Sequence, residues 1–130
     1  MNDLIRNRQA VAQIIDFRKL HIGNITPTDI DGFIEYNDKY FIFIETKYRD
    51  KPLPTGQRLA LQRLCDTLTS AGKHAIVFIT SHYAEIGMDI DFGETIVTEY
   101  RCGFQWVVTT ERTRLQDAIL SFIDKQERGS

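Results

Sequence analysis

Residues 29–57 read DIDGFIEYNDKYFIFIETKYRDKPLPTGQ, and this stretch decides the fold. Two runs rich in alternating apolar residues, 30–36 and 40–48, flank a polar, turn-prone NDK segment, which predicts a β-hairpin. One face of the second run would carry Phe41, Phe43, Glu45 and Lys47. The FIFI segment is bulky on both faces, which favours an interior strand that is covered on both sides.

Charged residues at the end of this apolar run indicate a functional site. Burying Glu45 and Lys47 costs free energy unless both side chains find partners. Asp31 lies near the start of the first strand, so the hairpin would bring all three residues to one edge of a small sheet. Two carboxylates and a lysine in this arrangement are typical of a divalent-metal phosphodiesterase.

Each residue of this group can be given a role. Asp31 and Glu45 would supply carboxylate ligands to a magnesium-type ion, and the carbonyl of Thr46 would supply a third oxygen. The ammonium of Lys47 would orient or activate the attacking water, or stabilise charge developing on the phosphate. Gln57 opens the following helix, where its amide would hold a water or a phosphate oxygen.

The segment after the hairpin reads as a crossover. A loop at 49–56 precedes a helix at 56–71, which Thr55 would cap and Gly72 would end. The helix would turn four leucines mostly inward: Leu59, Leu61, Leu64 and Leu68. The apolar run 75–80 predicts a buried strand parallel to the preceding one.

The remaining segments predict further elements around this unit. Residues 3–20 predict an amphipathic helix, and residues 21–28 form a break that could hold a short, irregular strand. Residues 81–94 read as irregular, the segments on either side of Gly103 as two short strands, and 111–127 as a terminal helix. The terminal helix has the apolar stripe Leu115, Ala118, Ile119, Phe122 and Ile123.

The segments D-I-D-G-F-I-E-Y, F-I-F-I-E-T-K and P-T-G-Q-R-L-A-L-Q-R-L resemble the PD-(D/E)xK nuclease superfamily over roughly residues 3–80. The resemblance implies an α/β fold with an α-β-β-β-α-β core and a mixed central sheet, followed here by C-terminal strands and a helix. It implies that Asp31 and Glu45 bind Mg²⁺, for which Mn²⁺ would substitute. It also implies that Lys47 is catalytic and that Gln57 is the accessory residue on the following helix.

Two choices stay open at the site. Asp29 competes with Asp31 for the first ligand position, or would act as an acid beside it; Asp31 is preferred because it is closer in sequence to Glu45 and precedes the apolar strand. Glu45 and Lys47 could instead form a plain surface ion pair. Five residues flanking the site could contact DNA phosphates or form a solvated surface: Lys39, Tyr48, Arg49, Lys51 and Arg58.

Composition bounds the function. The 130 residues suit one domain, 1–130, and the net charge of −2 excludes a strongly basic coat but not a local basic patch. No apolar run is long enough to span a membrane, and the N-terminus lacks a signal-peptide core, so a cytoplasmic protein is expected, in the host cytoplasm if phage-encoded. Cys65 and Cys102 form no CxxC pattern and are expected to be free thiols.

We therefore expect a Mg²⁺-dependent deoxyribonuclease that uses a metal-activated water, with a role in phage or mobile-element DNA processing, recombination or repair. Its small size makes a homodimer plausible, with the C-terminal strands and helix as the expected interface. The alternative is a catalytically silent nucleic-acid-binding or assembly protein that keeps the fold.

Overall fold

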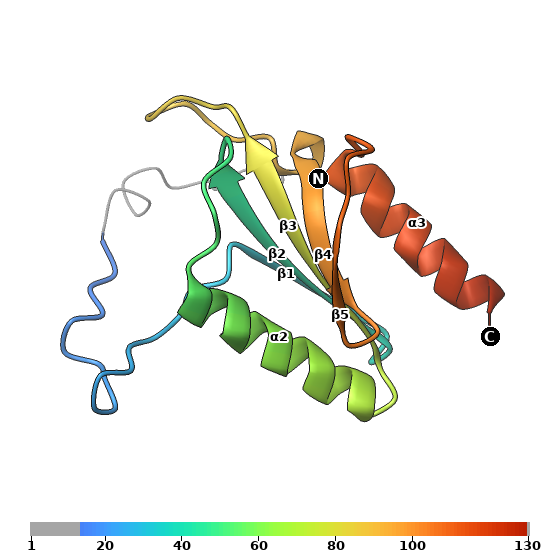
Figure 1. Ribbon diagram of the computed structural model, residues 1–130, viewed down its shortest axis with the longest axis horizontal. Coiled ribbons are helices and arrows are strands. Elements are labelled where there is room, and N and C mark those ends of the chain that lie inside the picture. Colours follow the sequence, from blue (N-terminus) through green and yellow to red (C-terminus); the bar gives the residue numbers. More distant parts are fainter. Residues whose placement is uncertain (1–13, 130) are drawn as a thin grey trace.

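The computed structural model describes residues 14–129 of the chain as an α/β structure. One mixed sheet has the strand order β1-β2-β3-β4-β5 (Figure 1). The strands are β1 (Gly32–Tyr36), β2 (Tyr40–Tyr48), β3 (His74–His82), β4 (Ile96–Cys102) and β5 (Gln105–Val108). Helix α2 (Thr55–Ser70) joins β2 to β3, the short 3-10 helix η1 (Phe92–Glu94) precedes β4, and helix α3 (Leu115–Arg128) follows β5.

The hairpin and the crossover are as the sequence predicts. Strands β1 and β2 are antiparallel and close at the pair Tyr36 and Tyr40. Between them Asn37 and Asp38 have φ angles of 54° and 56°, a left-handed conformation that Asn and Asp tolerate better than most residues. Strands β2 and β3 are parallel, with α2 as the connection, and β4 and β5 form the expected second hairpin.

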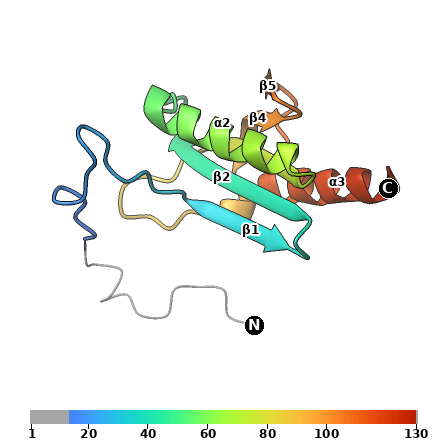
Figure 2. The ribbon, with the colours of Figure 1, turned by 90° about the horizontal axis from the view of Figure 1, so that it is seen from below.

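Strand β2 is covered on both faces, as the FIFI segment predicts. On one face Phe43 packs with Leu61 and Cys65 of α2. On the other face Ile42 and Ile44 pack with a group from α3 that includes Leu115, Ile119 and Phe122. Figures 1 and 2 show α2 and α3 on opposite sides of the sheet. The two clusters fix β2 as an interior strand, so its far end is held rigidly.

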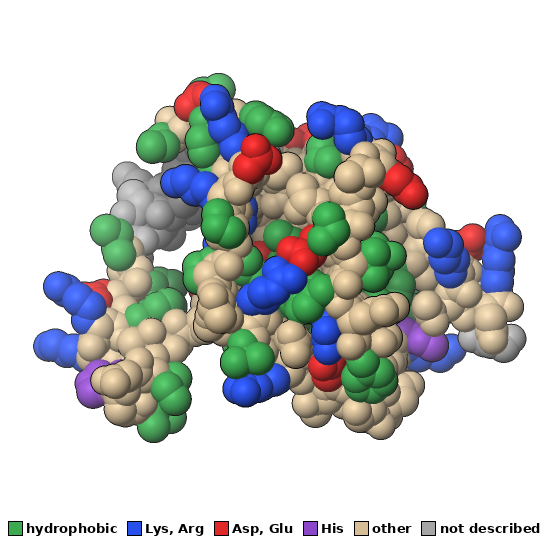
Figure 3. All heavy atoms as spheres, in the orientation of Figure 1, with side chains coloured by type: hydrophobic (Ala, Val, Ile, Leu, Met, Phe, Trp, Pro, Cys, Tyr) green, Lys and Arg blue, Asp and Glu red, His purple; other side chains and the backbone are tan. Residues whose placement is uncertain are grey.

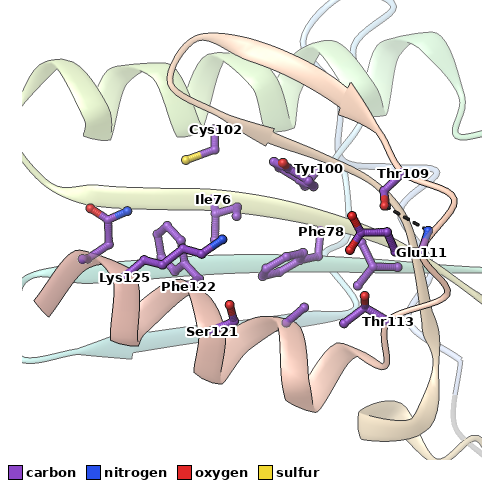
Figure 4. A pocket seen from close by; sticks show the side chains of 13 residues that line it. Ile76, Phe78, Tyr100, Cys102, Thr109, Glu111, Thr113, Ser121, Phe122 and Lys125 are labelled. Carbon is purple, nitrogen blue, oxygen red and sulfur yellow. Dashed lines mark hydrogen bonds between the residues drawn. The ribbon is translucent and has the colours of Figure 1, made fainter. Parts of the chain in front are cut away.

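Helix α3 leaves a cleft over the β4 side of the sheet. The cleft has a volume of about 360 Å³. Figure 4 shows Ser121, Phe122 and Lys125 of α3 on one side of it, with Ile76 and Phe78 of the sheet opposite. Since Ile76 and Phe78 belong to the α3 cluster, the cleft lies on the face of the sheet away from α2.

Details of α2 differ from the prediction. The helix begins at Thr55 itself, and Pro54 precedes it without any side-chain cap, so Thr55 is not the capping residue. Leu61 is buried, but Leu59 and Leu64 are 37% and 39% exposed, because only one stripe of the helix meets the sheet. Gly72 does end the helix, with a φ of +86°.

The segment before β1 also differs. The predicted helix at 3–20 falls largely outside the described residues, and its described part, 14–20, contains a turn and no helix. Ile14 and Ile15 are 90% and 80% exposed, so no packing surface offsets the cost of helix formation. The short, irregular strand that residues 21–28 could hold is not formed, since Ile22 and Ile25 form only an isolated bridge around the Gly23 turn.

The described order of elements is therefore β-β-α-β followed by β-β-α. The mixed sheet, the additional C-terminal strands and the terminal helix are confirmed. Between residues 14 and 31 no strand precedes β1, so the first strand that the nuclease resemblance implies is absent from that segment. No helix within residues 14–129 is long and apolar enough to cross a bilayer.

Candidate active site

The candidate site begins where β1 stops pairing with β2. The register of the hairpin ends at Gly32 opposite Ile44, so the next residues of β2 extend past the first strand. Asp31 fills this position. Its backbone N–H donates to Glu45 Oε1 at 2.9 Å, and its Oδ2 accepts from the backbone N–H of Thr46 at 2.9 Å. The two hydrogen bonds fix Asp31 beside the end of β2 and bring it to Glu45, as the sequence predicts.

Glu45 is a carboxylate with incomplete compensation for its burial. The residue is only 1% exposed, and its nearest cation, Lys47 Nζ, is 3.7 Å from Oε2. Burial raises the pKa of Glu45 above its ordinary value, and the nearby Asp31 and Asp29 carboxylates act in the same direction. The Asp31 amide and the Lys47 ammonium oppose this rise without cancelling it. The site therefore carries more negative charge than its own cation balances.

Lys47 is held between strand and helix. Its Nζ donates to Gln57 Oε1 at 3.4 Å, and Gln57 Nε2 donates to the carbonyl oxygen of Asp29 at 3.3 Å. Gln57 is in the first turn of α2, and the side chain of Lys47 is 24% exposed. Lys47 thus reaches solvent at the sheet edge. Asp29 contributes its backbone to this chain of contacts, while the side chain of Asp31 contacts β2 directly.

The donor set of this edge fits a divalent cation. Asp31 and Glu45 supply hard carboxylate oxygens beside each other, and their charge is only partly offset. The N–H of Thr46 points toward Asp31, and within a strand the C=O of a residue points to the same side as its N–H, so the Thr46 carbonyl also lies on the Asp31 side. Among residues 14–129 no group of three or more His, Cys, Asp or Glu side chains forms a metal cluster. The protein ligands would therefore be two carboxylates and this carbonyl.

Three of the residues predicted to bind DNA lie next to the site. Tyr48, Arg49 and Lys51 follow Lys47 at the end of β2 and in the adjoining turn. Tyr48 Oη donates to Glu85 Oε1 at 3.0 Å, and the Arg49 guanidinium is 3.5 Å from the same oxygen. The exposed Glu85 therefore contacts two of the three, while Lys51 is exposed.

The other two residues predicted to bind DNA, Lys39 and Arg58, do not lie beside Lys47 on the surface. Lys39 is in the β1–β2 turn, at the opposite end of β2 from Lys47. Arg58 forms a bidentate pair with Glu99 of β4, and its guanidinium lies 4.0 Å from the centre of the Trp106 ring. Arg58 is therefore engaged within the fold, and Lys39 is remote from the carboxylates.

The surface charge is mixed. On the face drawn in Figure 3, the Lys and Arg side chains are interspersed with acidic and apolar side chains and form no continuous basic stripe. An electrostatic contribution to DNA binding would therefore come from a few local cations, in agreement with the net charge of −2.

The structure adds residues that the sequence did not single out. A Cβ at Gly32 would lie 2.5 Å from Phe92 Cε2, so the ring of Phe92 packs directly on the backbone next to Asp31. Phe92 also lines a hollow with His82 and Ile90 on the other side of Asp31. The glycine after Asp31 is a sequence signal for a close approach. Its partner lies 60 positions later in a segment read as irregular, so nothing in the sequence identified it.

No protein-family model matches the chain, and neither the curated proteins nor the solved structures include one that is similar to it. The interpretation of this edge of the sheet therefore depends on its own geometry and on the motif resemblance.

Proposed function

We propose that the chain is a metal-dependent deoxyribonuclease of the PD-(D/E)xK type. The observation that carries this proposal is Glu45, which is a fully buried carboxylate beside Asp31 and is 3.7 Å from its nearest cation, Lys47. A purely structural ion pair gains little from so loose a contact and so deep a burial. A carboxylate that binds a cation in the working state accounts for both features.

Each residue of the site has one role in this proposal. Asp31, Glu45 and the Thr46 carbonyl would hold Mg²⁺, or Mn²⁺ in its place. The bound cation would supply the chemistry of lowering the pKa of a water and neutralising charge on the phosphate. Lys47 would orient the attacking water or stabilise the developing phosphate charge, and Gln57 would position Lys47 through their 3.4 Å contact.

The position of the site also favours a polymeric substrate. It lies at an open edge of the sheet, and the side chain of Lys47 is partly exposed. Tyr48, Arg49 and Lys51 continue from it along the surface and would contact phosphates on either side of the cleaved bond. A homodimer would present two such sites to two strands.

A cleavage assay tests the proposal. The purified chain is incubated with linear duplex, single-stranded, flap and four-way DNA in the presence of Mg²⁺, Mn²⁺ or EDTA. We expect cleavage with either metal and none with EDTA. Replacement of Lys47 by alanine should lower the rate by about 10²- to 10⁴-fold with the fold retained, as circular dichroism would show.

The matched control is Lys39→Ala, which removes a lysine of the β1–β2 turn, just before the start of β2 and away from Lys47. It should leave the rate within about twofold of wild type, since a remote surface charge contributes only weak screened interactions. If the wild-type chain cleaves none of these substrates with either metal but binds DNA without metal, the silent binding protein is the correct interpretation.

A further inference from the structure

A second hollow adjoins the candidate site and shares two of its residues. It has a volume of about 360 Å³ and is lined by Asp31, Thr46, His82, Ile90 and Phe92. Thr46 follows Ile44 by two positions on β2, so its side chain points to the α3 face of the sheet, opposite to Glu45 and Lys47. Asp31 thus contacts Glu45 through its backbone and also lines this hollow.

Two buried hydroxyls beside the hollow have no hydrogen-bond partner among the described residues, and one of them belongs to Thr46 in its lining. The hydroxyl oxygens of Thr46 and Thr80 are buried and accept or donate no hydrogen bond within residues 14–129. The two threonines are paired in the register of β2 and β3, and Thr80 is only 1% exposed. Buried hydroxyls without partners are uncommon, since each loses its hydrogen bonds to water. Thr46 lines the hollow, so one of these two unpaired hydroxyls lies in its wall, just beneath the surface.

His82 adds an imidazole to the lining of the hollow. Its Nδ1 accepts the backbone N–H of Ala84 at 3.2 Å, so the proton of the neutral ring is on Nε2. Because His82 lines the hollow, the polar contribution combines a carboxylate, a hydroxyl and an imidazole.

Phe92 forms a rigid apolar wall. Its ring packs against Gly32, and its carbonyl accepts both the N–H and the hydroxyl of Thr95, the latter at 2.7 Å. The ring also packs against the buried cluster under α3. Ile90, which is 43% exposed, forms a second apolar wall. A fixed aromatic ring beside a few polar groups is the arrangement that binds the flat face of a nucleobase.

From these contacts we infer that the hollow binds one unpaired nucleotide of the DNA strand, next to the phosphate that a metal ion at Asp31 and Glu45 would hold. The inference rests on the proposed nuclease function and specifies its substrate. A volume of about 360 Å³ is at the small end of ligand sites, and a base that is paired within a duplex cannot enter it. The substrate class is therefore single-stranded DNA, or DNA with a frayed end or flap at the cleavage site.

Binding is measured on the Lys47→Ala chain with Mg²⁺, so that the strand stays uncut. The probe is a deoxyoligonucleotide with one 2-aminopurine, used as a single strand and as a blunt duplex of the same sequence. We expect the single strand to bind at least tenfold more tightly, with a fluorescence change at one 2-aminopurine position. Adding Phe92→Ala should weaken binding of the single strand by at least about fivefold and leave duplex binding unchanged.

Two further variants serve as controls, one in case Phe92→Ala impairs folding and one for the loss of an aromatic ring elsewhere. Ile90→Ala removes an exposed wall that folding does not need, so it should weaken single-strand binding by about twofold even if Phe92→Ala impairs folding. Phe104→Ala removes an exposed aromatic ring in the β4–β5 turn and should change nothing. Equal affinity for strand and duplex, with both wall variants neutral, would overturn this inference while cleavage by wild type still supported the nuclease. Absence of both DNA binding and metal-dependent cleavage would overturn the proposed function as well.

Discussion

Two buried charged residues of this protein, Arg101 and Glu45, differ in how closely a partner of opposite charge contacts them. Arg101 of β4 is 8% exposed and donates to both oxygens of Asp66 on α2, at 3.0 and 2.6 Å. Glu45 of β2 is 1% exposed, yet its nearest cation is 3.7 Å away and its Oε1 accepts a hydrogen bond from the backbone N–H of Asp31. Arg101 has the bidentate geometry that makes a charged pair strong, and Glu45 does not.

Under the proposed function, this difference distinguishes a structural charge, Arg101, from a functional one, Glu45. The ion pair between Arg101 and Asp66 links β4 to α2, and the Arg101 guanidinium also lies 5.9 Å from the centre of the Trp106 ring. Both of these contacts lie within the fold. Glu45 lies at a sheet edge with a second carboxylate and a partly exposed lysine, and under the proposed function a bound cation would add to its contacts. Buried charges with incomplete bonding are expected where a protein binds a cation.

The largest expected effect follows from replacing Glu45 by glutamine. We expect the rate of metal-dependent cleavage to fall by about 10²- to 10³-fold, because a cation ligand is lost. The free energy of unfolding should stay within about 1 kcal/mol of wild type, because the amide still accepts the Asp31 N–H and no longer buries a charge. Cleavage assays and urea titrations in EDTA measure the two quantities.

Asp38→Asn is the control for this prediction, since it neutralises an exposed carboxylate in the β1–β2 turn. It should change neither cleavage nor stability beyond about 0.5 kcal/mol. A Glu45→Gln chain that unfolds like a core mutant, with cleavage unchanged in the folded fraction, would show that Glu45 is structural after all.

Replacing Arg101 by methionine should give the converse result. It leaves Asp66 without its bidentate partner, so the free energy of unfolding should fall by about 3 kcal/mol. Cleavage per folded molecule should stay near the wild-type value, because Arg101 contacts none of the residues at the Asp31 edge. Urea midpoints and rates measured well below the transition distinguish the two. A large loss of rate without loss of stability would contradict the comparison.

The pH dependence of the free energy of unfolding, measured in metal-free protein, should show a smaller effect whose direction can be predicted. Burial raises the pKa of Glu45 above its ordinary value, so the folded state binds its proton more tightly than the unfolded state. This contribution is fully present below the unfolded pKa and is lost as pH rises through the folded pKa. The stability of wild type relative to Glu45→Gln should therefore decrease as pH rises from about 4.3 upward. An increase over that range would mean that the pKa is lowered.

The sequence was sufficient for the parts of the fold that depend on local pattern. Alternation predicted β1 and β2, the NDK segment predicted their turn, and the length of α2 predicted the parallel placement of β3. The same hairpin register brought Asp31 to Glu45, so the core of the candidate site followed from spacing alone.

Contacts between distant segments were not predictable in the same way. The packing of Phe92 on Gly32 and the pairing of Arg58 with Glu99 depend on how η1 and β4 return to the sheet. Arg58 lies on α2 next to Gln57, which made it look like a phosphate contact. The sequence predicted a helix over residues 3–20, but in the described part, 14–20, Ile14 and Ile15 are exposed and pack on nothing, and tertiary packing is what stabilises such a short helix.

The smallest expected effect concerns Arg58, whose pairing resembles that of Arg101 at a less buried position. Its side chain is 33% exposed, and it contacts Glu99 and the Trp106 ring. Arg58→Lys should lower the free energy of unfolding by about 0.5–1 kcal/mol, because lysine loses the fork geometry and the stacking. It should leave the salt dependence of DNA binding unchanged. Lys51→Ala, at an exposed position beside the site, should do the reverse: stability unchanged, with the slope of log K against log salt reduced by about one. If Arg58→Lys changes the slope instead, the ion pair between Arg58 and Glu99 opens when DNA binds. Arg58 would then be a DNA-binding residue and not a purely structural one.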